Sequence, residues 1–322
     1  MSIVDVTTAY LDNRRLRDTA RSTMIKYRTF TNQLCEFATH KGYVMIDQFT
    51  AVDMDHFYAT WKDSANSKGK KLERMKGFWK FCVKRKWISE DPSEALEPPV
   101  NYSIPKHKSP FTDDELDRIY KAAAAWKPMP WHNRGERGVI TADQVIAFAM
   151  LLTETGLRIS DAATFNIERL NKGTQECFLF MHKTGKPLFT WINDDLSARL
   201  MALASQLGPT PFVTQSTDKQ TAADVWRERL SKVFAGAGPF AEHPTPHRFR
   251  HTFVRVQLAR GVPVEDVAEL IGDTPEMVRR HYARWVPERQ KRLTNILREP
   301  YQESQKAKWR SHVGNMPAPI NR

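Results

Sequence analysis

Apolar residues recur at helical spacing through most of the first 90 positions of the chain. The run STMIKYRTFTNQLCEFATHKG (22–42) places them every three or four residues and stops at Gly42, a residue type that commonly ends helices. Similar patterns follow over Met54–Trp61 and Leu72–Val83. We therefore expect an all-helical region over residues 1–98.

Prolines interrupt the helical pattern between Leu96 and Pro110, as expected of a linker. Thr112 and Glu115 then form a capping box, which begins a new helix. At 322 residues the chain also exceeds what one hydrophobic core usually supports. Four segments are expected: a helical domain over 1–98, a linker over 99–110, a second domain over 111–286 and a tail over 287–322.

The second domain shows mixed patterns. Apolar residues over Val145–Leu152 predict a buried helix that ends at Gly156. Two β-rich runs flank Thr184-Gly185 in CFLFMHKTGKPLFTWI (177–192) and predict a tight antiparallel hairpin. Residues 125–140 are rich in turn formers and are expected to form a loop. The expected fold is mainly α with a small antiparallel β-sheet, in two domains.

The motif HRFRH begins at His247 and concentrates basic side chains. We expect Thr245 to cap a helix and Pro246 to begin it. His247, Arg250 and His251 then fall at i, i+3 and i+4 on one helical face. Standing alone, such a run is as often an ordinary basic helix face.

Helix breaks punctuate the chain after this motif. Gly261 with Pro263 interrupts it, and Gly272 ends the next helix. Thr274-Pro275 opens a third helix, which carries Tyr282 near its end. A lone tyrosine is usually a core residue. Here an imidazole, a guanidinium and a phenol lie on short neighbouring helices, and these groups can hold and attack a phosphate.

This arrangement resembles the tyrosine recombinases, the phage-integrase family of site-specific DNA strand-exchange enzymes. Their second motif is His-x-x-Arg-His, followed by a Gly and a nucleophilic Tyr. The family also has an earlier Arg at a helix start and a Lys on a β-hairpin. The resemblance implies five catalytic residues: Arg158 (in LLTETGLRISD), Lys183, His247, Arg250 and Tyr282. At a sixth position, where the family usually has His or Trp after the Gly, this chain has Asp273.

Some of these positions have ordinary alternatives. Arg158 alone would be interpreted as a solvated surface residue, and Lys186 competes with Lys183 beside the hairpin turn. An ionised Asp273 cannot donate a hydrogen bond and should not face a phosphate directly. It either caps the helix that begins near Pro275, which base rates favour, or accepts a hydrogen bond from His247 or an arginine.

The resemblance also implies a mechanism. The two arginines would clamp a DNA phosphate, Tyr282 would attack to give a 3′-phosphotyrosine, and Lys183 would protonate the leaving 5′-oxygen. His247 would assist as proton acceptor or hydrogen-bond donor. No cofactor or metal is implied. Four protomers on two double-stranded DNA sites are implied, with an accessory DNA-bending protein left open. The alternatives are an inactive DNA-binding protein on the same fold and a type IB topoisomerase.

Charge agrees with a polyanionic partner. The net charge is +12 and the sequence pI is about 9.6. Ten Lys or Arg lie over Lys62–Lys86, against two acidic residues. We expect a DNA-binding surface there, although a charge run is often only a solvated face. The residues of this surface expected to bind DNA are Lys70, Lys71, Arg74 and Lys84. This region resembles the family's helical core-binding domain in pattern only.

The remaining features limit location and assembly. The three cysteines have no metal-ligand spacing, and an odd number argues against a disulfide framework. No apolar run is long enough to span a bilayer, and no signal peptide is recognised, so a cytoplasmic protein without membrane contact is expected. Residues 286–297 are expected to form a short amphipathic helix, which either packs on its own domain or docks on a neighbouring protomer.

Overall fold

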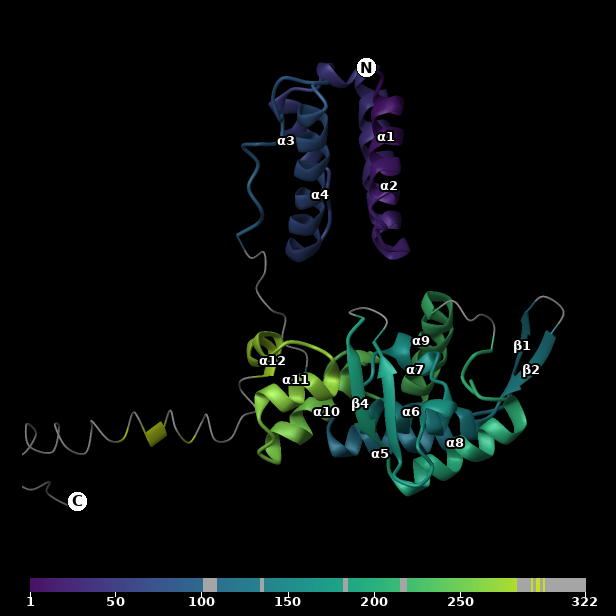
Figure 1. Ribbon diagram of the computed structural model, residues 1–322. Helices are drawn as coiled ribbons and strands as arrows, with labels where there is room; N and C mark the ends of the chain where they lie inside the picture. The colour runs from purple at the N-terminus through teal and green to yellow at the C-terminus, as the bar shows by residue number, and fades with distance from the viewer. Residues whose placement is uncertain are drawn as a thin grey trace, which may run out of the picture. The chain divides into compact units, whose positions relative to one another are not determined.

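The computed structural model of the protein describes residues 1–100, 109–133, 136–181, 185–214 and 219–282, with four further positions in the tail (291, 294, 295 and 298). The chain divides into two compact units, Met1–Pro105 and Lys106–Arg322. It is mainly helical, with two small antiparallel sheets in the described residues (Figure 1). The expected fold class is confirmed.

The N-terminal unit packs its helices around an aromatic core. Its helices are α1 (Ile3–Arg15), α2 (Arg21–Lys41), α3 (Ala51–Ala59) and α4 (Ala65–Lys84), with a 3-10 turn, η1 (Ile46–Gln48), after α2. Phe78 of α4 is fully buried and meets the rings of Tyr10 and Phe30 edge to face, at centroid distances of 5.1 and 5.8 Å. Gly42 ends α2 in the left-handed conformation, φ 73°. The helical patterns over residues 22–83 are thus confirmed.

The entry into the second unit follows the capping signal in the sequence. Residues 101–108 of the expected linker lie outside the described residues. Thr112 Oγ1 accepts a hydrogen bond from Glu115 N (3.1 Å), and Glu115 Oε2 accepts one from Thr112 N (3.0 Å). The capping box therefore begins α5 (Asp113–Ala124) as expected.

The second unit consists of helices and, in the described residues, two β-hairpins. Its other helices are α6 (Ala142–Thr155), α7 (Ile159–Ala163), η2 (Ile167–Arg169), α8 (Asp194–Leu207), α9 (Lys219–Gly236), α10 (His247–Ala259), α11 (Val264–Ile271) and α12 (Pro275–Tyr282). The strands are β1 (Met129–Asn133), β2 (Glu136–Ile140), β3 (Glu176–Phe180) and β4 (Pro187–Trp191). Strands β1 and β2 pair antiparallel, as do β3 and β4.

One of these hairpins corrects the expectation of a loop over residues 125–140. Met129 pairs with Ile140 and Pro130 with Val139, so the segment folds back on itself as β1 and β2. Its turn formers predicted only a loop. They did not indicate the pairing, which depends on contacts between strands.

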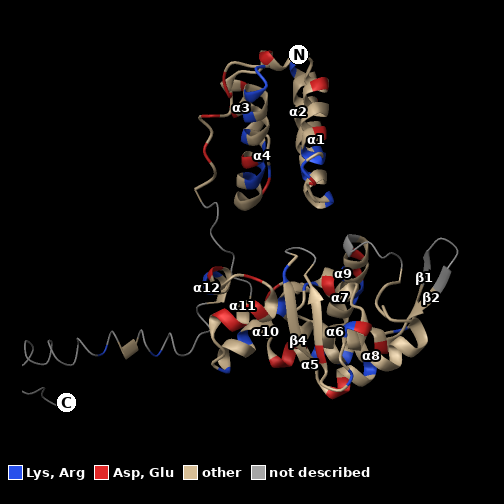
Figure 2. Cartoon of the chain, viewed as in Figure 1, with Lys and Arg blue, Asp and Glu red and all other residues tan. Residues whose placement is uncertain are grey.

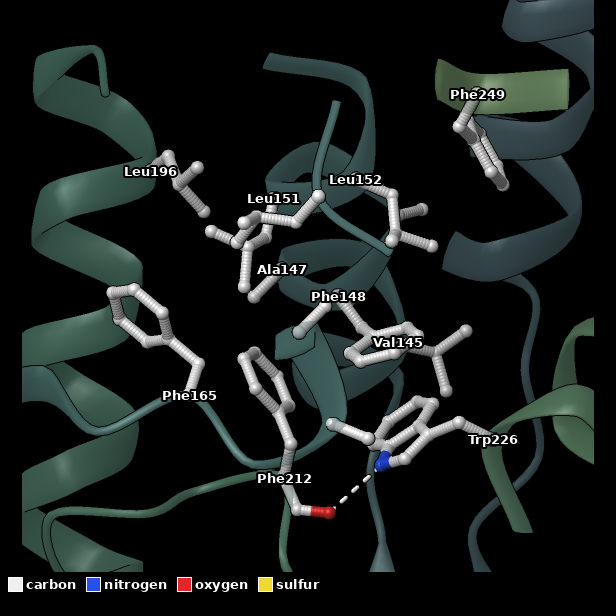
Figure 3. Close-up of a cluster of buried hydrophobic side chains, with 14 of the residues drawn as sticks. Val145, Ala147, Phe148, Leu151, Leu152, Phe165, Leu196, Phe212, Trp226 and Phe249 are labelled. Carbon is white, nitrogen blue, oxygen red and sulfur yellow. Dashed lines mark hydrogen bonds between the residues drawn. The ribbon is translucent and has the colours of Figure 1, made fainter. Parts of the chain in front are cut away.

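Helix α6 forms the centre of the second unit's core. Its residues Val145, Phe148 and Leu152 are fully buried. Phe148 stacks on Trp226 of α9 at 3.9 Å, and Trp226 Nε1 donates to the carbonyl of Phe212 at 2.7 Å (Figure 3). Each such side chain contributes about 1.5–3 kcal/mol by leaving water. This packing fixes α6, whose C-terminal end leads into the candidate site.

Candidate active site

The end of α6 brings the two arginine motifs together. Gly156 ends α6 with φ 61°, and a Cβ on it would lie 2.7 Å from Phe253 Cδ1 of α10. Glycine is therefore required both by the backbone conformation and by the close approach of α10. The carbonyl of Gly156 accepts a hydrogen bond from Arg250 Nη1 at 3.0 Å. Arg158 follows at the N-cap position of α7.

The turn between α11 and α12 lies against the β3–β4 hairpin. Gly272 has φ 59°, and a Cβ there would lie 2.9 Å from Met181 Cγ, just after β3. The backbone carbonyl of the following residue, Asp273, accepts a hydrogen bond from Lys186 Nζ at 3.4 Å. This close packing places Asp273 between the hairpin and the arginines.

Asp273 joins the two arginines. Its Oδ2 accepts hydrogen bonds from Arg158 Nη2 at 3.2 Å and Arg250 Nη2 at 3.1 Å. The cap of α12 is instead Thr274, whose Oγ1 accepts from Met277 N at 3.3 Å. The helix-cap role expected for Asp273 on base rates is therefore wrong, and its contacts match the other role considered, acceptance from an arginine.

The two guanidinium groups that share Asp273 are buried to different degrees, Arg250 almost fully and Arg158 partly. The Arg250 side chain is 2% exposed, and burial, with repulsion from Arg158, lowers its pKa to about 10 while Asp273 opposes the shift. Arg250 therefore stays charged at neutral pH. Arg158 Nη1 is buried and has no hydrogen-bond partner among the described residues. Two guanidinium groups on one carboxylate are an arrangement that also suits phosphate oxygens.

Tyr282 lies in the same buried cluster. Its Oη is 2.7 Å from His251 Nδ1, and its ring is tilted at 49° to the imidazole. Burial raises the pKa of Tyr282 to about 12, although the positive charges of Arg250 and Arg158 oppose that shift. At neutral pH the side chain is a phenol, and attack on phosphorus requires that its proton be removed.

His247 lies at the start of α10 and is exposed. Its ring centroid is 4.6 Å from that of His251, edge to face. It also lines a hollow of about 660 Å³ beside Thr245. Thr245 was expected to cap α10, and that expectation is wrong. Pro246 stands at the N-cap without a side-chain cap, and Thr245 Oγ1 is buried with no partner in the described part of the chain.

The structure thus gathers Arg158, Arg250, Asp273 and Tyr282, with His247 at the edge of the cluster. Sequence reasoning gave no role to His251. The signal was present, because His251 lies four residues after His247 on the same helical face. Lys183 lies outside the described residues, whereas its competitor Lys186 is described and exposed.

The four basic residues of the N-terminal unit that are expected to bind DNA line two separate hollows. Lys70, Lys71 and Arg74 line one of about 380 Å³, which also contains Lys26 of α2. Lys84 lines a second, of about 530 Å³. Figure 2 shows Lys and Arg distributed along α4. The second hollow also contains cations that sequence reasoning did not select: Arg14, Arg17, Lys80 and Arg85.

Lys71 differs from Lys70 and Lys84. Its Nζ is 3.6 Å from Asp63 Oδ2 and 4.3 Å from the centroid of the Trp61 ring. Burial lowers its pKa, and the charge of Asp63 opposes this. Lys71 therefore has internal partners, whereas Lys70 and Lys84 are exposed.

In the residues that the structure describes, no cluster of three or more His, Cys, Asp or Glu is placed to hold a metal ion. None of the helices in that part of the chain has the length and apolar character of a membrane span.

Residues 110–289 match the model of the phage integrase family. Tyrosine recombinase XerD of Haemophilus influenzae is 23% identical over 289 residues, which cover 85% of this chain and 91% of the relative. Tyrosine recombinase XerC of Agrobacterium fabrum is 27% identical over 279 residues, covering 80% and 81%.

Two solved structures of lambda integrase share the fold. A dimer bound to a COC′ core site matches with a TM-score of 0.66 and 15% identity, over 86% of this chain and 97% of that one. A tetramer bound to a Holliday junction gives 0.65 and 14%, over 84% and 77%.

Proposed function

This chain belongs to the phage integrase family and is a tyrosine recombinase, and we propose that it breaks and rejoins DNA at specific sites through a bond between Tyr282 and a 3′-phosphate. One observation carries the proposal. The Tyr282 hydroxyl lies 2.7 Å from His251 on α10, the helix that also carries Arg250, and Arg250 shares Asp273 Oδ2 with Arg158. A nucleophile and two phosphate-binding groups are thereby brought together.

The arginines would hold the scissile phosphate. A phosphodiester resists attack because its anionic oxygens repel a nucleophile, and fixed cations reduce that repulsion. Arg158 Nη1, which has no hydrogen-bond partner among the described residues, would donate to a phosphate oxygen. Asp273 would act through the arginines, because its Oδ2 already orients both. His247, exposed at the cluster's edge, would contact the phosphate or assist proton transfer.

A lysine would protonate the leaving 5′-oxygen. We assign this role to Lys183 from its place in the family motif. Lys186 is the second candidate, because its ammonium group lies beside Asp273. The covalent link conserves the energy of the phosphodiester, so rejoining needs neither ATP nor a metal.

The N-terminal unit would bind DNA through the exposed cations of its two hollows. We further propose assembly as a tetramer on two DNA sites, which the tetrameric lambda integrase on a Holliday junction supports. The tail, largely outside the described residues, would dock on a neighbouring protomer. Truncation after Trp285 should then reduce pairing of two sites while single-site cleavage persists, and equal loss of both would favour packing in cis.

Asp273 also supports a second candidate, DNA binding without cleavage. Its carboxylate already occupies hydrogen-bond donors of Arg158 and Arg250. An anion at this place would oppose the negative charge of a phosphate. A type IB topoisomerase would share the chemistry, but the compact N-terminal helical unit favours the recombinase.

A nicked suicide duplex separates these functions. The duplex carries the recombination site recovered from the genomic junctions beside the gene, so that cleavage releases a short strand and traps the covalent adduct. A recombinase forms the adduct and joins two sites, a topoisomerase forms it without joining sites, and an inactive binder forms none. If the wild type gives no adduct and Asp273→His restores one, the protein is a DNA-binding protein that does not cleave.

A further inference from the structure

The His251 imidazole is placed to act on the nucleophile itself. Its Nδ1 is 2.7 Å from Tyr282 Oη, within the reach required of a general base. Both side chains are buried, at 9% and 5% exposure. Nδ1 can accept the phenolic proton when the ring's other nitrogen, Nε2, carries the hydrogen. The pair joins α10 to the end of α12, directly beside the arginines.

We propose that His251 is a catalytic residue that takes the proton from Tyr282 as the tyrosine attacks the phosphate. This inference rests on the proposed function. In the step, Tyr282 Oη bonds to phosphorus and the bond from phosphorus to the 5′-oxygen breaks. The phenolic proton passes to His251 Nδ1, and the leaving oxygen takes a proton from the acid lysine. Religation reverses both transfers.

The other groups around Tyr282 are less suited to this task. Arg250 and Arg158 are cationic and only donate. Asp273 Oδ2 already accepts from both arginines. His281 is next to Tyr282 on α12, and the centroids of the two rings are 6.3 Å apart. His247 is exposed and lies against His251, one helical turn earlier on α10. His247 is thereby left to contact the phosphate.

A need for a base follows from the environment of Tyr282. Burial raises its pKa to about 12, so the phenolate is scarce at neutral pH. Without an acceptor, the attack would depend on ionisation of the phenol, and the rate would rise with pH towards that value. With His251 as acceptor, the rate levels off once the imidazole is neutral. The pH profile therefore distinguishes a catalytic His251 from one that only packs against Tyr282.

The test compares His251→Asn and His251→Ala with the wild type on the nicked suicide duplex. Asparagine places its Oδ1 near the position of Nδ1, so it can accept a hydrogen bond without taking up a proton. Both variants should form the adduct about 100-fold more slowly at pH 7, in the range for loss of a general base. Their rates should keep rising at high pH, where the wild-type rate is level. Thermal unfolding and DNA affinity of His251→Asn should stay close to wild type.

Two controls assign the loss to the nucleophile. A 5′-bridging phosphorothiolate, whose thiolate leaves without an acid, should rescue Lys183→Ala but neither His251 variant. His247→Asn should slow cleavage while retaining the wild-type pH profile. If His251→Asn cleaves at the wild-type rate, or slows without a change in profile, His251 is not the base. If the wild type forms no adduct, the proposed function fails as well.

Discussion

The cations of the two units are held in different ways. In the N-terminal unit, Lys70 and Lys84 are exposed and line open hollows. In the second unit, Arg248 and Arg250 are each 2% exposed at the side chain and bind named carbonyl and carboxylate oxygens. Exposed cations provide charge, which neighbouring cations can replace. Buried arginines hold fixed positions, which neighbouring cations cannot take.

Among the variants that keep Tyr282, the largest effect is expected from Arg250→Ala. It removes the side-chain donor to the buried Gly156 carbonyl, leaves Asp273 with Arg158 as its remaining arginine partner, and removes one phosphate clamp. We expect adduct formation to fall on the order of 100- to 1,000-fold, as when one transition-state donor is lost. Stability should fall by about 1–3 kcal/mol, the usual cost of a buried acceptor left without its donor. Suicide-substrate kinetics and denaturant unfolding measure the two losses.

Arg248 provides the matched control, because it is buried on the same helix but points elsewhere. Its Nη2 lies 2.7 Å from Glu115 Oε2, and its other nitrogens donate to the carbonyls of Ser109 and Glu242. Arg248→Ala should lose at least as much stability, because it breaks an ion pair that is buried on both sides, while the folded fraction still cleaves DNA. Equal loss of cleavage per folded molecule in both variants would show that burial alone explains Arg250.

The next effect concerns the leaving group. Lys183→Ala should slow cleavage about 100-fold, the usual scale for loss of a general acid. A 5′-phosphorothiolate should restore the rate, and Lys186→Ala should show a smaller loss. Equal rescue of both variants by the thiolate substrate would remove the basis for choosing Lys183.

A smaller effect is expected from Asp273→Asn. The amide oxygen can still accept from one arginine, but the negative charge between the two guanidinium groups is lost. Cleavage should slow roughly 10-fold, as for other groups that orient a functional side chain. Thermal unfolding should change little. A variant with unaltered cleavage would indicate that the contact with the arginines has no catalytic role.

The smallest effect per residue is expected in the N-terminal unit. Replacing Lys70, Lys71, Arg74 and Lys84 by Gln should weaken DNA binding and flatten its dependence on salt. Each lost phosphate contact reduces the slope of log affinity against log salt by about 0.9. Lys71→Gln alone should alter the slope least, because Asp63 and Trp61 already hold its ammonium. An unchanged slope in the quadruple variant would identify a merely solvated face.

The difference between local and long-range contacts decides how much of the structure the sequence predicts. Helix ends were predictable, because Gly42, Gly156 and Gly272 adopt positive φ for local reasons. The capping box at Thr112 was also local. The joint contact of Arg158 and Arg250 with Asp273 links residues 115 and 23 positions apart, and it depends on the packing of Phe253 and Met181 against glycines. No local pattern contains that information.

Local signals also misled where tertiary contacts decide. Thr245 is of a residue type that favours helix N-caps, yet its hydroxyl is buried without a partner in the described residues. Asp273 was expected as a cap, but Thr274 takes that place. The pairing of His251 with Tyr282 spans 31 residues. Spacing placed His251 on the correct face and could not identify what that face meets.

The central claim is that Tyr282 is the nucleophile, and mapping the trapped adduct tests it most directly. Wild-type protein is trapped on the suicide duplex and digested, and the peptide that carries the nucleotide is sequenced by mass spectrometry. We expect the phosphate on Tyr282 and no adduct from Tyr282→Phe, which removes one hydroxyl and should still bind DNA. An SDS-stable, protease-sensitive adduct formed by Tyr282→Phe, or a wild-type adduct on another residue, would contradict the account.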